Sequence, residues 1–136
     1  MLYKQQSFSN FEPDLRYLDS FPFSREEFLF FDIETTGFSP RNTSLYLIGA
    51  VCFLDEHWTF LQWFAETPSE ECEILNAFLA FCRSFRALVH FNGDGFDIPY
   101  LLFKAEKYTL SDTLSSMQSI DLYHLTRPYK KYLKLT

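Results

Sequence analysis

Two acidic residues separated by one position interrupt a strongly apolar stretch. Asp32 and Glu34 follow the apolar run 28–31 and flank Ile33. Residues two apart in a β-strand point to the same face, so the two carboxylates would lie side by side. Such charges at the end of a buried strand are costly unless a cation compensates them, and carboxylate oxygens are the ligands that Mg²⁺ and Mn²⁺ prefer. The alternative is that the strand ends at Ile33 and both acids are solvated.

A second acidic segment lies at residues 90–99, where an apolar run leads through a glycine-rich loop into an expected helix. Asp97 would lie at the start of that helix, beyond the carboxyl end of a strand, where α/β sheets bind ligands. Asp97 could equally be an N-cap that interacts favourably with the helix dipole. We interpret Asp94 as a turn residue and Asn92 as a brace of the loop through its side-chain amide.

The elements needed to position these acids form an α/β domain. The pattern of apolar, β-branched and aromatic residues predicts five strands, at 28–34, 45–53, 58–64, 87–91 and 120–123. A capping box from Thr67 to Glu70, with Pro68 at the first helical position, predicts a helix reaching Phe85. A second helix is expected from Asp97 to about residue 107. We therefore expect a mixed sheet of three antiparallel strands and then parallel additions, flanked by helices.

The chain divides into two parts by its pattern. Residues 1–26 contain Pro13 and Pro22 and lack a regular period, so we expect an N-terminal arm that packs its Phe and Tyr residues on the domain. Residues 27–136 would form the domain itself.

Composition excludes several classes of protein. The chain has 136 residues, 47% of them hydrophobic, with four Gly and six Pro, which excludes a disordered linker. The longest uncharged apolar run, 45–54, is about half of a membrane span, and no apolar signal core begins the chain. Three cysteines without metal-ligand spacing read as reduced and buried, so we expect a cytoplasmic protein. The net charge is −6, but the last ten residues carry +4.

Together, the two acidic segments resemble a known family. FDIETTG at 31–37 and FNGDGFDIPYL at 91–101 are similar to motifs of the DEDD exonucleases, within the ribonuclease H-like superfamily. The resemblance is closest to the bacterial YprB-type ribonuclease H-like domain and covers about residues 28–134. IDLYHLTR at 120–127 resembles the stretch before the closing part of such domains. The resemblance implies a ribonuclease H-like fold with a five-stranded mixed sheet.

The resemblance also implies which residues carry the chemistry. Asp32 and Glu34 match the acids of the first exonuclease motif, and Asp97 matches the acid of the second. They would be the catalytic residues and the ligands of two Mg²⁺ or Mn²⁺ ions, with Asp32 contacting both ions. Glu34 would complete one side, and Asp97 would hold a water molecule on an ion. The positions expected to bind the substrate are Thr35, Thr36, Gly37 and Asn92.

One part of the family pattern is missing from these 136 residues. The third motif of the family places a Tyr or His a few residues before a fourth Asp on a last helix, but no Asp or Glu follows Asp121. We therefore expect a C-terminally truncated domain that cleaves very slowly or not at all by itself. Asp121 could replace the missing acid; the alternatives are a structural cap or a surface charge.

The predicted function is metal-dependent hydrolysis of nucleic-acid phosphodiester bonds, of the 3′→5′ exonuclease type. The expected partners are a single-stranded end of DNA or RNA and further domains or chain beyond residue 136, but no membrane. The alternative is a catalytically inactive ribonuclease H-like module that binds nucleic acid or has a structural role. Trp58 and Trp63 could stack on bases, although their strand pattern favours packing. His57, His90 and His124 have no ligand spacing, so we expect core or surface roles.

Overall fold

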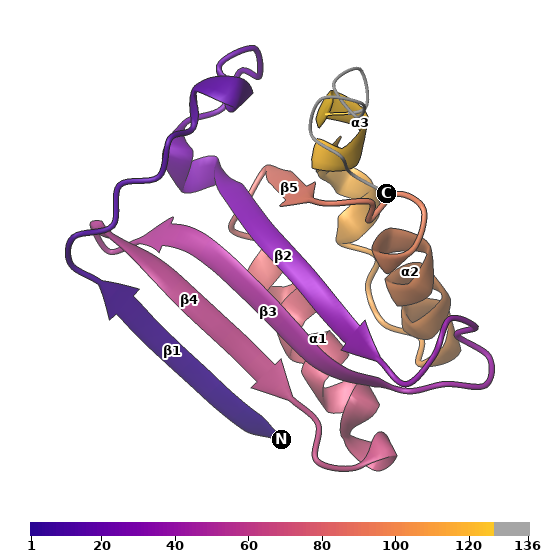
Figure 1. Ribbon diagram of the computed structural model, residues 1–136. Helices are drawn as coiled ribbons and strands as arrows, with labels where there is room; N and C mark the ends of the chain where they lie inside the picture. Colours follow the sequence, from indigo (N-terminus) through magenta and orange to yellow (C-terminus); the bar gives the residue numbers. More distant parts are fainter. Residues whose placement is uncertain (127–136) are drawn as a thin grey trace.

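Six strands form one mixed sheet in the computed structural model, which describes residues 1–126 (Figure 1). The order across the sheet is β1-β4-β3-β2-β5-β6. The strands are β1 (Leu2–Phe8), β2 (Phe28–Thr35), β3 (Leu45–Leu54), β4 (His57–Phe64), β5 (Ala87–His90) and β6 (Gln118–Asp121). The helices are α1 (Glu71–Cys82), α2 (Asp97–Lys107) and α3 (Leu122–Thr126).

The strand pairing confirms the predicted α/β class and mixed sheet. β1, β4, β3 and β2 pair antiparallel in that order, and β5 adds to β2 and β6 to β5, both in parallel. The structure corrects the strand number from five to six. The additional strand, β1, comes from the segment that we expected to be irregular. All seven of its residues are exposed, so β1 lacks the alternation of buried and exposed residues that identifies a strand in sequence. Its pairing with β4 defines it as a strand.

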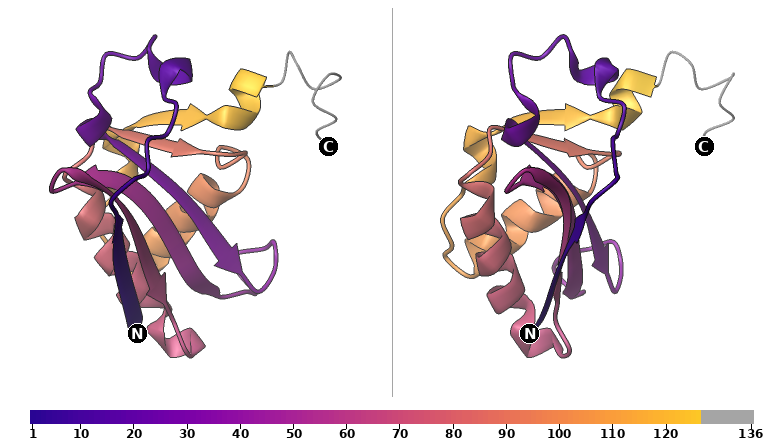
Figure 2. Two further views of the ribbon diagram at one scale, coloured as in Figure 1. Left: turned by 60° about the vertical axis from the view of Figure 1, so that its left-hand side comes forward. Right: turned by 90° about the vertical axis from the view of Figure 1, so that its left-hand side faces the viewer.

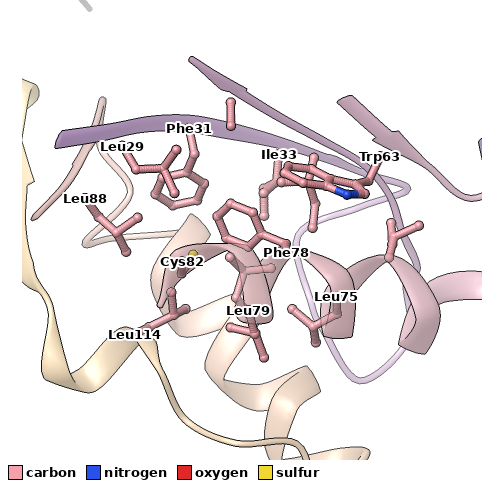
Figure 3. Close-up of a cluster of buried hydrophobic side chains, with 14 of the residues drawn as sticks. Leu29, Phe31, Ile33, Trp63, Leu75, Phe78, Leu79, Cys82, Leu88 and Leu114 are labelled. Atoms are coloured by element: carbon pink, nitrogen blue, oxygen red, sulfur yellow. The ribbon is translucent and has the colours of Figure 1, made fainter. Parts of the chain in front are cut away.

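Both longer helices lie against one face of the sheet, as the turned views in Figure 2 show. On β2 the residues facing the helices are Leu29, Phe31 and Ile33, and all three are buried. They pack on side chains of α1 that include Phe78, whose ring centroid lies 5.5 Å from that of Phe31 (Figure 3). This burial fixes the face to which each residue of β2 points.

A smaller apolar cluster lies at the β5–β6 end of the sheet. Leu18, from the segment before β2, is buried with Phe28, Val89 and Ile120. Phe21 and Phe23 pack against this cluster from the same segment. The N-terminal residues thus cover apolar surface that α1 and α2 do not reach.

The start of α1 differs from the predicted capping box. Pro68–Glu70 form a 3₁₀ turn, and α1 begins at Glu71. The Thr67 hydroxyl lies 2.7 Å from that of Ser69, and Glu70 accepts hydrogen bonds from the backbone N–H of Glu66 and from the Met1 ammonium. Glu70 therefore binds the chain before Thr67 and the N-terminal end of β1 instead of closing a capping box.

Several other expectations concern single residues. Trp58 and Trp63 are buried in aromatic clusters, so both have packing roles. No disulfide joins the three cysteines, of which Cys72 is only half-buried.

Within residues 1–126, no helix is both long enough and apolar enough to cross a membrane. The last ten residues, which carry the basic charge noted in the sequence, lie outside the described residues.

A buried ion pair joins α1 to α2. Lys104 and Glu71 are 1% and 2% exposed, with Lys104 Nζ 3.2 Å from Glu71 Oε2. Lys104 also donates to the backbone carbonyl of Thr43 at 2.7 Å, and Glu71 accepts from the backbone N–H of Leu45 at 2.6 Å and from the Tyr108 hydroxyl. The pair therefore fixes both helices to the chain that enters β3.

Replacing Lys104 with Met should leave the Glu71 carboxylate buried without its cation. Because breaking a buried pair from one side is strongly destabilising, we expect Lys104→Met to lower the free energy of unfolding by about 3–5 kcal/mol in urea denaturation. The matched control is Arg16→Met at the exposed Arg16–Asp14 pair, where we expect a loss of less than about 1 kcal/mol. An equal decrease in the free energy of unfolding in the two variants would show that the buried pair stabilises the fold no more than the exposed pair does.

Candidate active site

Strand β2 presents two carboxylates on the sheet face opposite the helices. Because Phe31 and Ile33 are buried in the core, Asp32 and Glu34 point to the other face and are exposed. Their partners on β3 are Gly49 and Leu47. An open pocket of about 360 Å³ lies on this face, and its lining includes both acids, Phe30, Phe60 and Gln62. The acids therefore lie at an accessible, largely apolar hollow.

The short length of β5 makes room for Asp97 beside β2. The parallel pairing of β5 with β2 ends at Phe30 and Val89, before the strand reaches Asp32. The chain then turns through residues 91–96 and enters α2 at Asp97. Asp97 is 7% exposed and lies close to Asp32 and to the backbone N–H of Ile33. Two acids separated by 65 positions in sequence thus meet at the edge of one strand.

Burial and the nearby Asp32 both change the protonation of Asp97. Burial and the neighbouring charge of Asp32 raise the pKa of Asp97 to about 7, although the Ile33 N–H acts in the opposite direction. In the described residues, no Lys or Arg forms a salt bridge with Asp32, Glu34 or Asp97. The site thus concentrates negative charge without a protein cation among residues 1–126, which is the condition that favours a bound metal ion.

Glu34 is less closely associated with this pair. It lies two residues beyond Asp32 on the same face, at the pocket. In the part of the chain that the structure describes, His90, Asp94 and Asp121 are the one trio whose potential ligand atoms all lie within 4.8 Å of one another. The structure therefore brings Asp32 and Asp97 together, and leaves Glu34 farther from a shared point.

The loop after β2 uses its hydroxyl groups to hold its own shape. The Thr35 hydroxyl donates to the carbonyl of Gly37 at 2.7 Å, and the Thr36 hydroxyl accepts from the backbone N–H of Ser44 at 2.9 Å. A Cβ on Gly37 would lie 2.7 Å from Thr43 Cγ2, so only glycine fits here without movement. These three residues thus bring the loop into close contact with the chain that enters β3.

The loop before α2 is braced differently from our expectation for Asn92. Asn92 has a φ of 58°, and its backbone N–H donates to Asp121 at 2.7 Å, while its carbonyl accepts from the N–H of Gly95. Its backbone thus braces the loop. Asp94 is more than a turn residue, since its carboxylate accepts from the Ser119 hydroxyl at 2.7 Å. Asp121 lies in this group and caps α3 through the Tyr123 N–H.

One residue of the site region was missed by the sequence analysis. Phe38 is 89% exposed, and its ring centroid lies 6.1 Å from that of Phe96, directly before Asp97. The sequence feature that could have identified Phe38 is the presence of a large aromatic residue in a polar turn, immediately after the acidic motif. Such a ring offers a face on which a nucleobase could stack.

Comparisons with known proteins agree with this fold. The sequence model of a family described as the RNase_H superfamily matches residues 29–135. A solved structure of the family B DNA polymerase from the hyperthermophilic archaeon Pyrobaculum calidifontis is similar, with a TM-score of 0.62 and 18% identity. The similarity covers 75% of this chain and 16% of the polymerase chain. No curated protein sequence matches. The predicted ribonuclease H-like fold is confirmed.

The raised pKa of Asp97 predicts a loss of stability as the pH rises. Between about pH 4 and pH 7 the folded chain binds a proton at Asp97 that the unfolded chain releases, so the free energy of unfolding falls with pH. Asp97→Asn should remove this dependence, and the difference between the two proteins should change by up to about 1.4 kcal/mol per pH unit in metal-free buffer. Urea titrations at several pH values test this. Parallel stability profiles of the two proteins would show that Asp97 ionises normally.

Proposed function

We propose that this chain, which belongs to the RNase H superfamily, hydrolyses phosphodiester bonds of nucleic acid with the help of divalent metal ions. The observation that carries this proposal is the contact between Asp32 and Asp97, two acids from distant motifs at the edge of β2. Within the superfamily, the segments at 31–37 and 91–101 favour a 3′→5′ exonuclease of the DEDD type, and among these the YprB-type domain. The substrate would be a single-stranded end.

The donor set fits a hard divalent cation. Asp32 and Asp97 supply carboxylate oxygens, and burial together with the neighbouring charge of Asp32 raises the pKa of Asp97, so a cation would favour its ionised form. Asp32, Asp97 and, from the same face, Glu34 would hold Mg²⁺ or Mn²⁺. When bound in such sites, these ions activate water and stabilise the charge on the phosphate and the leaving oxygen.

The residues of this chain would have distinct tasks in the reaction. Asp97 would release its proton when a cation binds, so it would be ionised in the working site. Backbone groups of residues 35–37 would approach the terminal nucleotide, and Gly37 permits a close approach of the chain. Phe38 would stack on a base, and Asn92 would lie at the opposite loop.

A second candidate function is a nucleic-acid-binding module without catalysis. The observation that favours it is that Glu34 lies apart from the contact between Asp32 and Asp97, so the three matched acids do not form one group of ligand atoms among the described residues. The two candidates share the binding surface and differ in turnover. Binding and cleavage must therefore be measured separately.

Manganese should stabilise the folded chain at this site. Because a cation binds the ionised acids of the folded state, we expect millimolar Mn²⁺ to raise the Tm, and to raise it more at pH 8 than at pH 5.5, where Asp97 is protonated. Asp32→Asn should greatly reduce the shift. Asp55→Asn, at the exposed β3–β4 turn, is the matched control and should retain it. A shift that is the same in all three proteins would place Mn²⁺ elsewhere.

Turnover and binding can be separated with a single-stranded oligonucleotide labelled at its 5′ end. We expect slow, Mn²⁺-dependent shortening from the 3′ end by the parent chain and by Asp55→Asn, but none by Asp32→Asn or Asp97→Asn. Phe38→Ala should weaken binding of the same oligonucleotide by about fivefold or more, because a base–aromatic stack is worth about 1–3 kcal/mol. Binding without any shortening would favour the non-catalytic module. The absence of both binding and shortening would contradict both candidates.

A further inference from the structure

The strand at one edge of the sheet, β1, has a side without a partner strand. It pairs with β4 through all seven of its residues without a bulge, and within residues 1–126 no other strand pairs with it (Figure 1). The free side of an edge strand presents a row of backbone N–H and C=O groups that can pair with another chain. β1 therefore offers the hydrogen-bonding groups that one more strand would need.

Little in β1 protects this edge against pairing. Edge strands in natural proteins are usually short, or they contain proline, a bulge or several charged side chains. β1 has seven residues, no proline and one charged side chain, that of Lys4. The strand at the other edge, β6, has only four residues. Of the two edges, β1 is the one that an added strand fits better.

Exposed apolar side chains gather on β1 and just beyond it. Eight large hydrophobic side chains are exposed among the described residues, and four of them belong to the first eleven residues: Leu2, Tyr3, Phe8 and Phe11. Their exposed fractions run from 39% to 54%. The rings of Phe8 and Phe11 also contact each other, with centroids 6.0 Å apart. A strand that pairs with β1 would cover part of this apolar surface as well as the backbone groups.

The sequence of β1 is complementary to itself when two copies run antiparallel. The register that pairs all seven residues is centred on Gln5, which lies opposite Gln5 of the second copy. Leu2 then lies opposite Phe8 of the second copy, so an apolar pair forms at each end of the strand. Lys4 lies opposite Gln6 of the second copy, so no like charges are directly opposed, which would be unfavourable.

The contacts of Tyr3 are compatible with the same register. Its ring packs on Trp63, with centroids 5.7 Å apart, and its hydroxyl donates to Gln5 Oε1 at 2.7 Å. The residue opposite Tyr3 would be Ser7 of the second copy, whose small side chain leaves room for the ring. Pairing therefore requires no rearrangement of β1.

We propose that β1 binds a second copy of this chain, antiparallel and centred on Gln5, so that two six-stranded sheets join into one. The contact uses the same surface of both copies and closes as a two-fold dimer. Opposite residues point to the same face, so the helices of both copies lie on one face and both Asp32 pockets on the other. A single strand edge is small beside the roughly 1,200–2,000 Å² that stable interfaces bury, so the dimer is weak and reversible.

Sedimentation velocity over a concentration series tests the dimer. We expect the average mass of the parent chain to rise with concentration toward that of two chains. Gln5→Glu would bring two carboxylates together at the two-fold axis, so the dissociation constant should rise at least about tenfold at low salt. The matched control is Gln118→Glu, the same change at an exposed position of β6, which should dimerise like the parent. Because both positions are exposed, the Tm of each variant should stay close to that of the parent.

Cysteine cross-linking tests the register. Opposite residues of an antiparallel pair have Cα atoms about 4.5–5.5 Å apart, which a disulfide can span. Gln5→Cys should therefore form a covalent dimer under mild oxidation. Ser7→Cys should not, because residue 7 and its symmetry copy would lie roughly 13–14 Å apart along the strands. The parent chain, with its own three cysteines, gives the background.

Three results would overturn the proposal. A chain that stays monomeric at every concentration would leave the edge of β1 to a strand of a different protein. A dimer weakened by Gln118→Glu and not by Gln5→Glu would place the interface at β6. Cross-linking through Ser7→Cys and not through Gln5→Cys would contradict the register. Because none of these measurements involves metal or nucleic acid, their outcome is independent of the proposed nuclease function.

Discussion

The buried ion pair between Glu71 and Lys104 is the interaction on which the arrangement of the helices depends. Two charges removed from water are tolerated only when their geometry and hydrogen bonds are nearly complete, and here both side chains also bind backbone groups near β3. The requirement fixes the position of α2 along the sheet. Asp97 begins the same helix about two turns earlier, so the pair indirectly sets where that carboxylate meets β2.

Much of the fold was predictable because its signals are local. The apolar run before Asp32 and the helical spacing before Phe85 each reflect burial against a neighbouring element. β1 could not be predicted in the same way, because an exposed edge strand with one partner has little apolar pattern. The expected capping box failed for a related reason, since the Glu70 carboxylate binds the distant amino group of Met1.

The candidate site was predictable only in its residue types and its two motifs. Strand alternation places Asp32 and Glu34 on one face, but only the early end of β5 explains why Asp97 reaches Asp32 while Glu34 stays farther away. The grouping of His90, Asp94 and Asp121 depends on the parallel register of β5 and β6, which linear spacing does not contain. Phe38 was visible as an isolated aromatic residue, but its exposure depends on how the loop folds.

The turn between β3 and β4 has a consequence for the order in which the sheet assembles. Asp55 and Glu56 both have positive φ, as in the tight turns that match the twist of a hairpin, and the strands pair directly from Leu54 and His57. This hairpin needs only neighbouring residues, whereas β1 pairs with residues fifty or more positions later. Because closing long loops is slow, we expect folding to begin at this hairpin and proceed outward. The contact between Asp32 and Asp97 would then be among the last to form. The charge repulsion between the two acids would therefore lower the stability of the folded state and have little effect on the rate of the early folding steps.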